Sequence, residues 1–195
     1  MSTTTAARPV TRGRGAKPVP LIVAGIVLFI GSELMFFASL FGMYFTLRAQ
    51  DHPWTPPDVK VDLYRVFFTA FLVASSFTMQ HAVTRLKRND RAGLRRWVWI
   101  TVLFGVTFLG GQIYEWTTLP FRINTNAYGS AFYAMTGFHG LHVLAGLILM
   151  VVILGRARQG AYTPDEHGGV EVATYYWHFV DVVWIALFIV LFVIR

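Results

Sequence analysis

Five long apolar segments restrict what this chain can fold into. They cover about residues 18–47, 66–84, 97–118, 128–154 and 173–194. Each is close to the ~20 apolar residues that a helix needs to cross the hydrocarbon core of a bilayer. Hydrophobic residues make up 55% of the chain and charged residues only 14%, against about 25% charged in ordinary soluble domains. The sequence therefore predicts an all-α membrane protein, with a five-helix transmembrane bundle formed by residues 18–195.

The basic residues lie mostly at one end of such a bundle. Twelve of the seventeen Lys and Arg residues precede the first segment, separate the second from the third, or follow the fourth. With five crossings these stretches share one side, which the positive-inside rule places in the cytoplasm. We expect residues 1–17 to be a basic, disordered cytoplasmic tail and the C-terminus to be extracytoplasmic. Orientation and anionic lipid headgroups account for the net charge of +7, so no nucleic-acid partner is expected.

The tryptophans are expected to lie mainly in the two membrane interfaces. Four of them are at or near segment ends, and one is in the first connection: Trp97, Trp99, Trp116, Trp177 and Trp54, respectively. Such positions are typical of the aromatic belts of membrane proteins. In the fifth segment, Trp177, Asp181 and Trp184 also fall on one stripe of a helix.

A few ionisable side chains lie inside the apolar segments and are the candidates for function. They are Glu33 in the first segment, Glu115 in the third, His139 and His142 in the fourth, and His178 and Asp181 in the fifth. Charges at this depth are costly, so such groups usually face the protein interior or mark a function. The two pairs, in the fourth and fifth segments, each have the three-residue spacing that places side chains on one helix face.

Three interpretations of these side chains stay open on the residues alone. Imidazole and carboxylate groups could hold iron, zinc or manganese. Helical di-metal sites, however, use several inward-facing Glu residues and Glu-x-x-His pairs, and here the acids are too few and wrongly spaced. Sites that need cysteine are excluded, because the chain has none. A proton or ion pathway through Glu33 and the histidines is the second interpretation, and mutual satisfaction of polar groups between helices is the third.

Three motifs carry a resemblance to a known family. "SELMFF" in the first segment, "GSAFYAMTGFHGLHVLAG" entering the fourth and "YYWHFVDVVWI" in the fifth resemble subunit III of the haem-copper terminal oxidases, the cytochrome c oxidase family. The resemblance runs from about residue 20 to the C-terminus. The family commonly has seven helices, and this chain is similar to the five-helix bacterial form that lacks the first two. Loss of an even number of helices preserves the orientation expected from the charges.

The resemblance implies a subunit of the bacterial plasma membrane that holds no redox centre, no metal and no catalytic residue. Haem and copper would lie in the partner subunits I and II. The whole complex would transfer electrons from cytochrome c to oxygen, form water and pump protons. In the family, subunit III packs on subunit I, binds phospholipid in a cleft between its helices, and supports proton uptake and resistance to inactivation during turnover.

The resemblance also assigns expected roles to individual residues. Glu33 matches the buried helix carboxylate of the family that reacts with carbodiimide, so it is expected to be buried and protonated. The other candidates are expected to make interhelical bonds or to lie close to lipid. They are Glu115, His139, His142, His178 and Asp181.

The resemblance leaves the electron donor and the wider assembly open. The quinol-oxidising branch also has five-helix members, although Glu33 in place of Asp and Val180 in place of Leu favour the cytochrome c branch. A cytochrome bc complex in a supercomplex is a further candidate partner. The alternative from another functional class is a free-standing proton-coupled transporter built around Glu33.

Overall fold

The computed structural model describes residues 21–51, 54, 59 and 62–194, which form five long helices and one π-helical turn. Their bounds are α1 Leu21–Gln50, α2 Leu63–Lys87, α3 Arg91–Thr118, α4 Ala127–Arg158, α5 Gly168–Phe188 and η1 Ile189–Val193. All five long helices have the length and hydropathy to cross a membrane, and the described residues contain no strand. The all-α, five-helix prediction is confirmed. The expected tail of residues 1–17 lies outside the described residues, so the division into tail and membrane domain stays a prediction.

Helix ends reach past the apolar segments because charged residues continue the helix into the interface. Helix α3 begins after Asp90, whose side chain accepts a hydrogen bond from the Gly93 amide at 2.7 Å. Helix α4 begins in the same way after Asn126, which accepts from the Gly129 amide. Such side chains satisfy amide groups that the first helical turn leaves unpaired. At the left-handed turn after α2, Asn89 has a φ of 59°.

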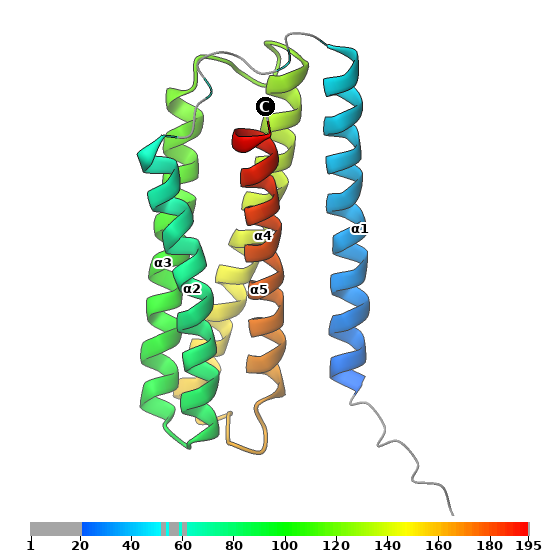
Figure 1. Cartoon of the computed structure of the whole chain (residues 1–195). Helices are drawn as coiled ribbons and strands as arrows, with labels where there is room; N and C mark the ends of the chain where they lie inside the picture. The colour runs from blue at the N-terminus through cyan, green and yellow to red at the C-terminus, as the bar shows by residue number, and fades with distance from the viewer. Residues whose placement is uncertain (1–20, 52–53, 55–58, 60–61, 195) are drawn as a thin grey trace, which may run out of the picture.

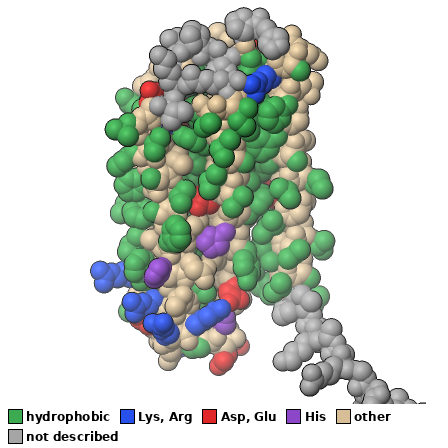
Figure 2. Space-filling view, in the orientation of Figure 1, with side chains coloured by type: hydrophobic (Ala, Val, Ile, Leu, Met, Phe, Trp, Pro, Cys, Tyr) green, Lys and Arg blue, Asp and Glu red, His purple; other side chains and the backbone are tan. Residues whose placement is uncertain are grey.

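The helices form a bundle in which α1 stands to one side (Figure 1). Helices α2 and α3 are an antiparallel pair, α5 packs against α2 and α4, and α1 packs mainly against α4 and α5. The start of α1 lies at the same end as the α2–α3 and α4–α5 connections, and α5 ends at the other end. Figure 2 shows Lys and Arg side chains gathered at the first of these ends, below a flank covered by hydrophobic side chains. This separation of charge is the one on which the predicted orientation depends.

The centre of the bundle is filled by Trp177. Its side chain is 0% exposed, and it lies against Gly105 of α3 and Gly146 of α4. A Cβ atom at Gly105 would be 2.8 Å from Trp177 Cη2, and one at Gly146 would be 2.7 Å from Trp177 Cε3. Small residues at these two places therefore make room for the indole. The interface-belt prediction is wrong for Trp177, which faces inward.

Trp54 is a second exception to the predicted belt. It is buried against the rings of Tyr44 and Tyr128, with ring centroids 5.2 Å and 5.6 Å away. Trp99, by contrast, is 50% exposed, as a belt residue should be. Ring packing thus closes the end of the bundle at which α1 ends.

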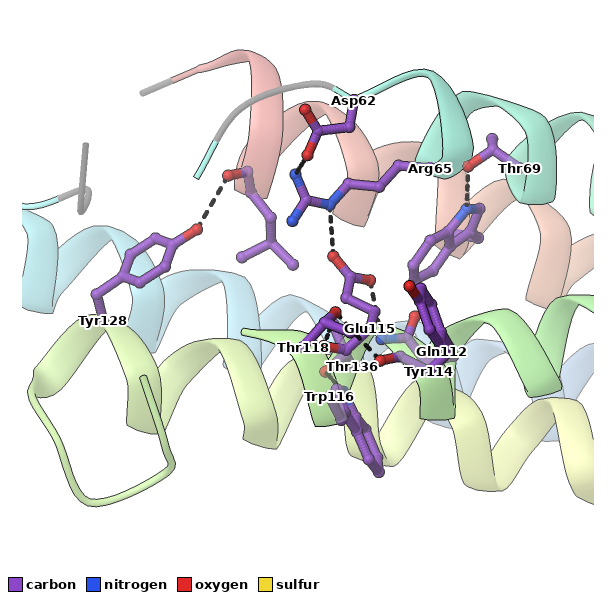
Figure 3. Close-up of polar contacts among 12 residues, drawn as sticks. Asp62, Arg65, Thr69, Gln112, Tyr114, Glu115, Trp116, Thr118, Tyr128 and Thr136 are labelled. Atoms are coloured by element: carbon purple, nitrogen blue, oxygen red, sulfur yellow. Dashed lines mark hydrogen bonds and ion pairs between the residues drawn. The ribbon is translucent and has the colours of Figure 1, made fainter. Parts of the chain in front are cut away.

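The π-helical turn η1 ties three helices together at that same end. Tyr44 of α1 donates a hydrogen bond to the Val190 carbonyl, and Tyr128 of α4 donates to the Leu191 carbonyl, each at 3.2 Å. Figure 3 shows the Tyr128 hydroxyl pointing at its acceptor. Carbonyl groups near a helix end have no partner inside the helix. The two tyrosines supply partners and connect α1 and α4 to the end of the chain.

Candidate functional site

Glu33 and His142 form a contact between α1 and α4, near the middle of both helices. Glu33 Oε2 is 2.9 Å from His142 Nε2, and the two side chains are 22% and 18% exposed. The ring of Phe37 lies edge-on to the imidazole at 4.9 Å, and Phe36 lies at 6.0 Å. Glu33 was expected to be buried, but the structure places it at the half-buried margin where α1 meets α4.

The second nitrogen of His142 fixes how the proton of this pair can be placed. His142 Nδ1 is 2.7 Å from the Phe138 carbonyl, which can only accept, so Nδ1 carries a hydrogen. Nε2 then either accepts a hydrogen bond from the protonated Glu33 carboxyl or donates one to the ionised carboxylate. A hydrogen bond between Glu33 Oε2 and His142 Nε2 requires one proton between them, and with that proton the pair has no net charge. A neutral pair costs much less in an apolar environment than an isolated carboxylate.

A second polar cluster joins α2 to α5. Three side chains of α5 face α2, at the four- and three-residue intervals predicted for one stripe. Trp177 Nε1 donates to Ser75 Oγ at 2.8 Å and Trp184 Nε1 donates to Thr69 Oγ1 at 3.1 Å. Between them, the Ser76 hydroxyl donates to Asp181. The predicted stripe is therefore a polar seam that holds two helices together.

His178 and Asp181 meet through this same serine rather than directly. His178 Nδ1 is 3.1 Å from Ser76 Oγ. Because the Ser76 proton goes to Asp181, its oxygen accepts from His178 Nδ1. The other imidazole nitrogen is 3.4 Å from Gln80 Oε1. The spacing in the sequence indicated a shared face, but it could not identify the residues of α2 that link the pair.

His139 is packed by rings and lies apart from His142. It stacks on Trp184 with centroids 5.0 Å apart, and Phe108 lies edge-on at 6.0 Å. Neither nitrogen has a hydrogen-bond partner among the described residues, although the ring is fully buried. The two histidines of the fourth segment thus point to different places, one into the core and one toward α1. Phe37 of α1 is the ring that contacts both.

Glu115 belongs to a third cluster, which involves a residue that sequence reasoning missed. Arg65 Nε is 2.6 Å from Glu115 Oε1, and Arg65 Nη1 is 2.9 Å from Asp62 Oδ2. Gln112 donates to the other Glu115 oxygen at 3.3 Å, and the guanidinium lies over the Phe192 ring at 4.9 Å. Figure 3 shows Arg65 placed between the two carboxylates.

Arg65 lies just before the predicted segment 66–84, but the structure places it in the first turn of α2, with its side chain 5% exposed. The Glu115 side chain is equally buried. Their positions in the sequence could have indicated the pair. Arg65 lies at the start of the second segment and Glu115 near the end of the third, and one short connection joins these two segments. Antiparallel neighbours bring such ends to the same depth.

These clusters do not combine into a metal-ligand set. Within residues 21–51, 54, 59 and 62–194, no three His, Asp or Glu side chains come together in a way that could hold a metal ion. Glu33 with His142, His178 with Asp181, and Glu115 with Arg65 are three separate arrangements. What they can do chemically is hold protons and bind helices to one another.

A groove of about 460 Å³ runs between α1 and α5. Its walls are mostly apolar, with Ile26 and Ile30 on one side and Phe179 and Val182 on the other. Tyr175 and His178 are the lining residues with polar atoms. His178 thus belongs both to the wall of the groove and to the Ser76 cluster. Its shape and lining suit an apolar chain.

The sequence comparisons show which family the chain is similar to. The family model for cytochrome c oxidase subunit III matches residues 16–194. A probable cytochrome c oxidase subunit 3 of Mycobacterium leprae is 49% identical over 183 residues, which cover 90% of this chain and 89% of the relative. The corresponding Mycobacterium tuberculosis protein is 48% identical over 180 residues, with the same coverage. The cytochrome c oxidase subunit 3 of Thermostichus vulcanus is 42% identical over 174 residues, covering 88% and 87%.

A family match over nearly the whole described chain, five membrane-crossing helices and relatives matched over almost their full length lead to one conclusion. The chain belongs to the cytochrome c oxidase subunit III family, as a multi-pass membrane subunit of an oxidoreductase complex with other oxidase subunits.

Proposed function

We propose that this chain is the non-redox subunit III of a proton-pumping cytochrome c oxidase in a bacterial plasma membrane. It stabilises subunit I and sustains proton uptake while the partner subunits reduce oxygen to water. The observation that carries the proposal is the Glu33–His142 pair. It joins a carboxyl and an imidazole 2.9 Å apart near the middle of two membrane-crossing helices, at the margin where α1 meets α4.

The supporting rather than catalytic role rests on how the polar side chains are used. Glu33, Glu115 and Asp181 each bond to a side chain of a neighbouring helix. Side chains engaged in this way hold a bundle together, and we place haem and copper in subunits I and II. Carboxylates and histidines at this depth are costly unless they are paired.

Cytochrome c is the electron donor that we favour. The relatives in Mycobacterium and Thermostichus are named cytochrome c oxidase subunits, and Glu33 and Val180 lean to the same branch. A quinol oxidase is the competing assignment. Since the donor binds to other subunits, the donor preference of the purified complex decides between them.

Phospholipid is the ligand that we assign to the α1–α5 groove. Its apolar walls match an acyl chain, and Val27 and Val182 in its lining are exposed apolar side chains. A lipid there would cover part of α1, the helix of which only Ile26, Phe37 and Tyr44 are buried. Filling the groove with Val182→Trp should displace that lipid.

The proposed orientation has a direct test. A reporter fused after Arg195 should behave as extracytoplasmic, and one inserted between Lys87 and Arg91 as cytoplasmic, because the second connection is rich in basic residues. The opposite pair of results would overturn the orientation.

The central experiment is removal of the whole chain from the purified oxidase. We expect the haem absorbance and the initial rate of electron transfer to stay, and the half-life of activity during turnover to shorten. Adding the chain back should restore the half-life. Loss of the haem signal from an otherwise intact subunit I would mean that this chain supplies ligands, and an unchanged half-life would contradict the supporting role.

A further inference from the structure

A cavity at the α3–α4 connection lies apart from all the clusters above. Its volume is about 710 Å³, larger than that of the α1–α5 groove, and its lining includes Trp116, Arg122, Ile123, Asn124 and Tyr133. We propose that this cavity binds the phosphate headgroup of a phospholipid through Arg122. The proposal deepens the lipid-binding part of the proposed function, at a second site.

The walls of the cavity are held in place by hydrogen bonds. Trp116 Nε1 donates to Thr136 Oγ1 at 3.2 Å, and the Tyr133 hydroxyl lies 3.2 Å from the Trp116 carbonyl. In the connection, the Arg122 amide donates to Thr125 Oγ1 at 2.8 Å, and the Thr125 amide returns a bond to the Arg122 carbonyl. The segment that carries the guanidinium is therefore fixed at its backbone.

Arg122 supplies the positive charge in the lining of the cavity. Arg122 is exposed, and no Asp or Glu of the described residues forms an ion pair with it. Glu115, which directly precedes the lining residue Trp116, bonds to Arg65 instead. In Figure 3 the Trp116 indole points away from that ion pair, so the cavity and the ion pair lie on different sides of α3. A guanidinium is suited to an anion with several oxygens, and Asn124 lines the same cavity.

The position of the cavity indicates which anion it takes. It lies where α3 ends and α4 begins, at the ends of two membrane-crossing helices. Aromatic residues such as Trp116 and Tyr133 mark the headgroup level of a bilayer at such ends. Ile123 is 58% exposed beside the cavity, and Ile113, one helical turn below Thr117, is 55% exposed. A lipid with an anionic headgroup and apolar chains can contact both the guanidinium and these exposed isoleucines. Free phosphate would contact only the guanidinium.

A basic cavity at the other end of the bundle is a weaker candidate. It is lined by Arg85 and Arg96, but Asp90 lies in the same wall, 3.6 Å from Arg85. That carboxylate already neutralises one guanidinium and would repel a phosphate. None of the described residues that line the α3–α4 cavity carries a carboxylate.

Lipid counting on the intact oxidase complex tests the site. The complex is stripped of lipid in detergent, titrated with phosphatidylglycerol and examined by native mass spectrometry. We expect Arg122→Gln to weaken binding of one lipid per complex about tenfold, as expected for loss of a charge-assisted hydrogen bond. Arg122→Lys should keep most of the affinity. The matched control is Arg88→Gln, an exposed arginine of the α2–α3 connection, which should leave the count unchanged.

Three outcomes would overturn the proposal. Equal lipid counts for the wild type and Arg122→Gln would mean that Arg122 does not bind a lipid headgroup. Displacement of the lipid by an equal concentration of inorganic phosphate would mean a phosphate site rather than a lipid site. Cross-links from residue 122 to an acidic residue of a partner subunit would mean that protein covers the cavity. Because Val182→Trp reports on the groove lipid and chain removal reports on turnover, failure at Arg122 is distinguishable from failure of the proposed function.

Discussion

Helices α5 and α1 both pack against the centre of the bundle, but they are held there in different ways. Helix α5 is bonded to α2 through Trp177, Asp181 and Trp184, and ten of its residues are buried. Helix α1 buries three residues and makes two side-chain hydrogen bonds to other helices among those described, from Glu33 and Tyr44. The most apolar helix of the chain is thus the least buried one.

The contrast between α5 and α1 indicates that stability and function depend on different helices in this fold. In a bilayer the lipid is as apolar as the core, so hydrophobicity alone does not hold helices together. Close packing and interhelical hydrogen bonds have to do so, and the α2–α5 seam supplies both. The family carboxylate Glu33 lies instead on the helix with the fewest contacts, where loss of one bond changes the stability of the bundle little.

The largest effect is expected from Trp177→Ala in the seam. It empties the space between Gly105 and Gly146 and leaves Ser75 without its donor, so it should destabilise the subunit by about 3–5 kcal/mol. Thermal unfolding of the purified complex measures the loss. The control is Trp99→Ala, which removes an exposed indole and should change the midpoint little. Equal effects of the two changes would mean that the seam is not the stabilising element.

A smaller effect is expected at the ion pair that joins α2 to α3. Arg65→Met leaves Glu115 as a buried carboxylate without its cation, at a cost of about 3 kcal/mol. Arg65→Met combined with Glu115→Gln removes both charges and should recover most of that loss. If the double variant were as unstable as the single one, packing around Arg65, rather than charge, would be the cause.

The number of helices was predictable because apolar segments of this length form membrane-crossing helices. The predicted segment 66–84 became α2 Leu63–Lys87, and segment 128–154 became α4 Ala127–Arg158. Each helix continues past its apolar segment, since Arg and Lys at the interface are compatible with helical backbone. Boundaries set by hydropathy alone therefore came out short.

The faces of the helices were much harder to predict than their number. Outward and inward faces are both apolar in a membrane helix, so the sequence gives little amphipathic pattern to read. This is why Trp177 was placed in an interface and why the partner of Glu115 was missed. Partners such as Ser76 for Asp181, or Arg65 for Glu115, are 105 and 50 residues away in the chain. Only the packing of helices brings them together.

The smallest effect is expected from Glu33→Gln on α1. Because His142 Nδ1 carries a hydrogen, the other nitrogen of the neutral ring can accept a bond from the glutamine amide, so the interhelical contact persists. Stability should fall by less than about 1 kcal/mol, and steady-state oxygen reduction should stay within about twofold of the wild type. Glu33→Leu, which leaves His142 Nε2 without a partner, is the matched variant and should loosen α1 more. Loss of nearly all activity in an assembled Glu33→Gln complex would make Glu33 an obligatory proton carrier, and the weakly held helix would then be the functional centre of the subunit rather than its margin.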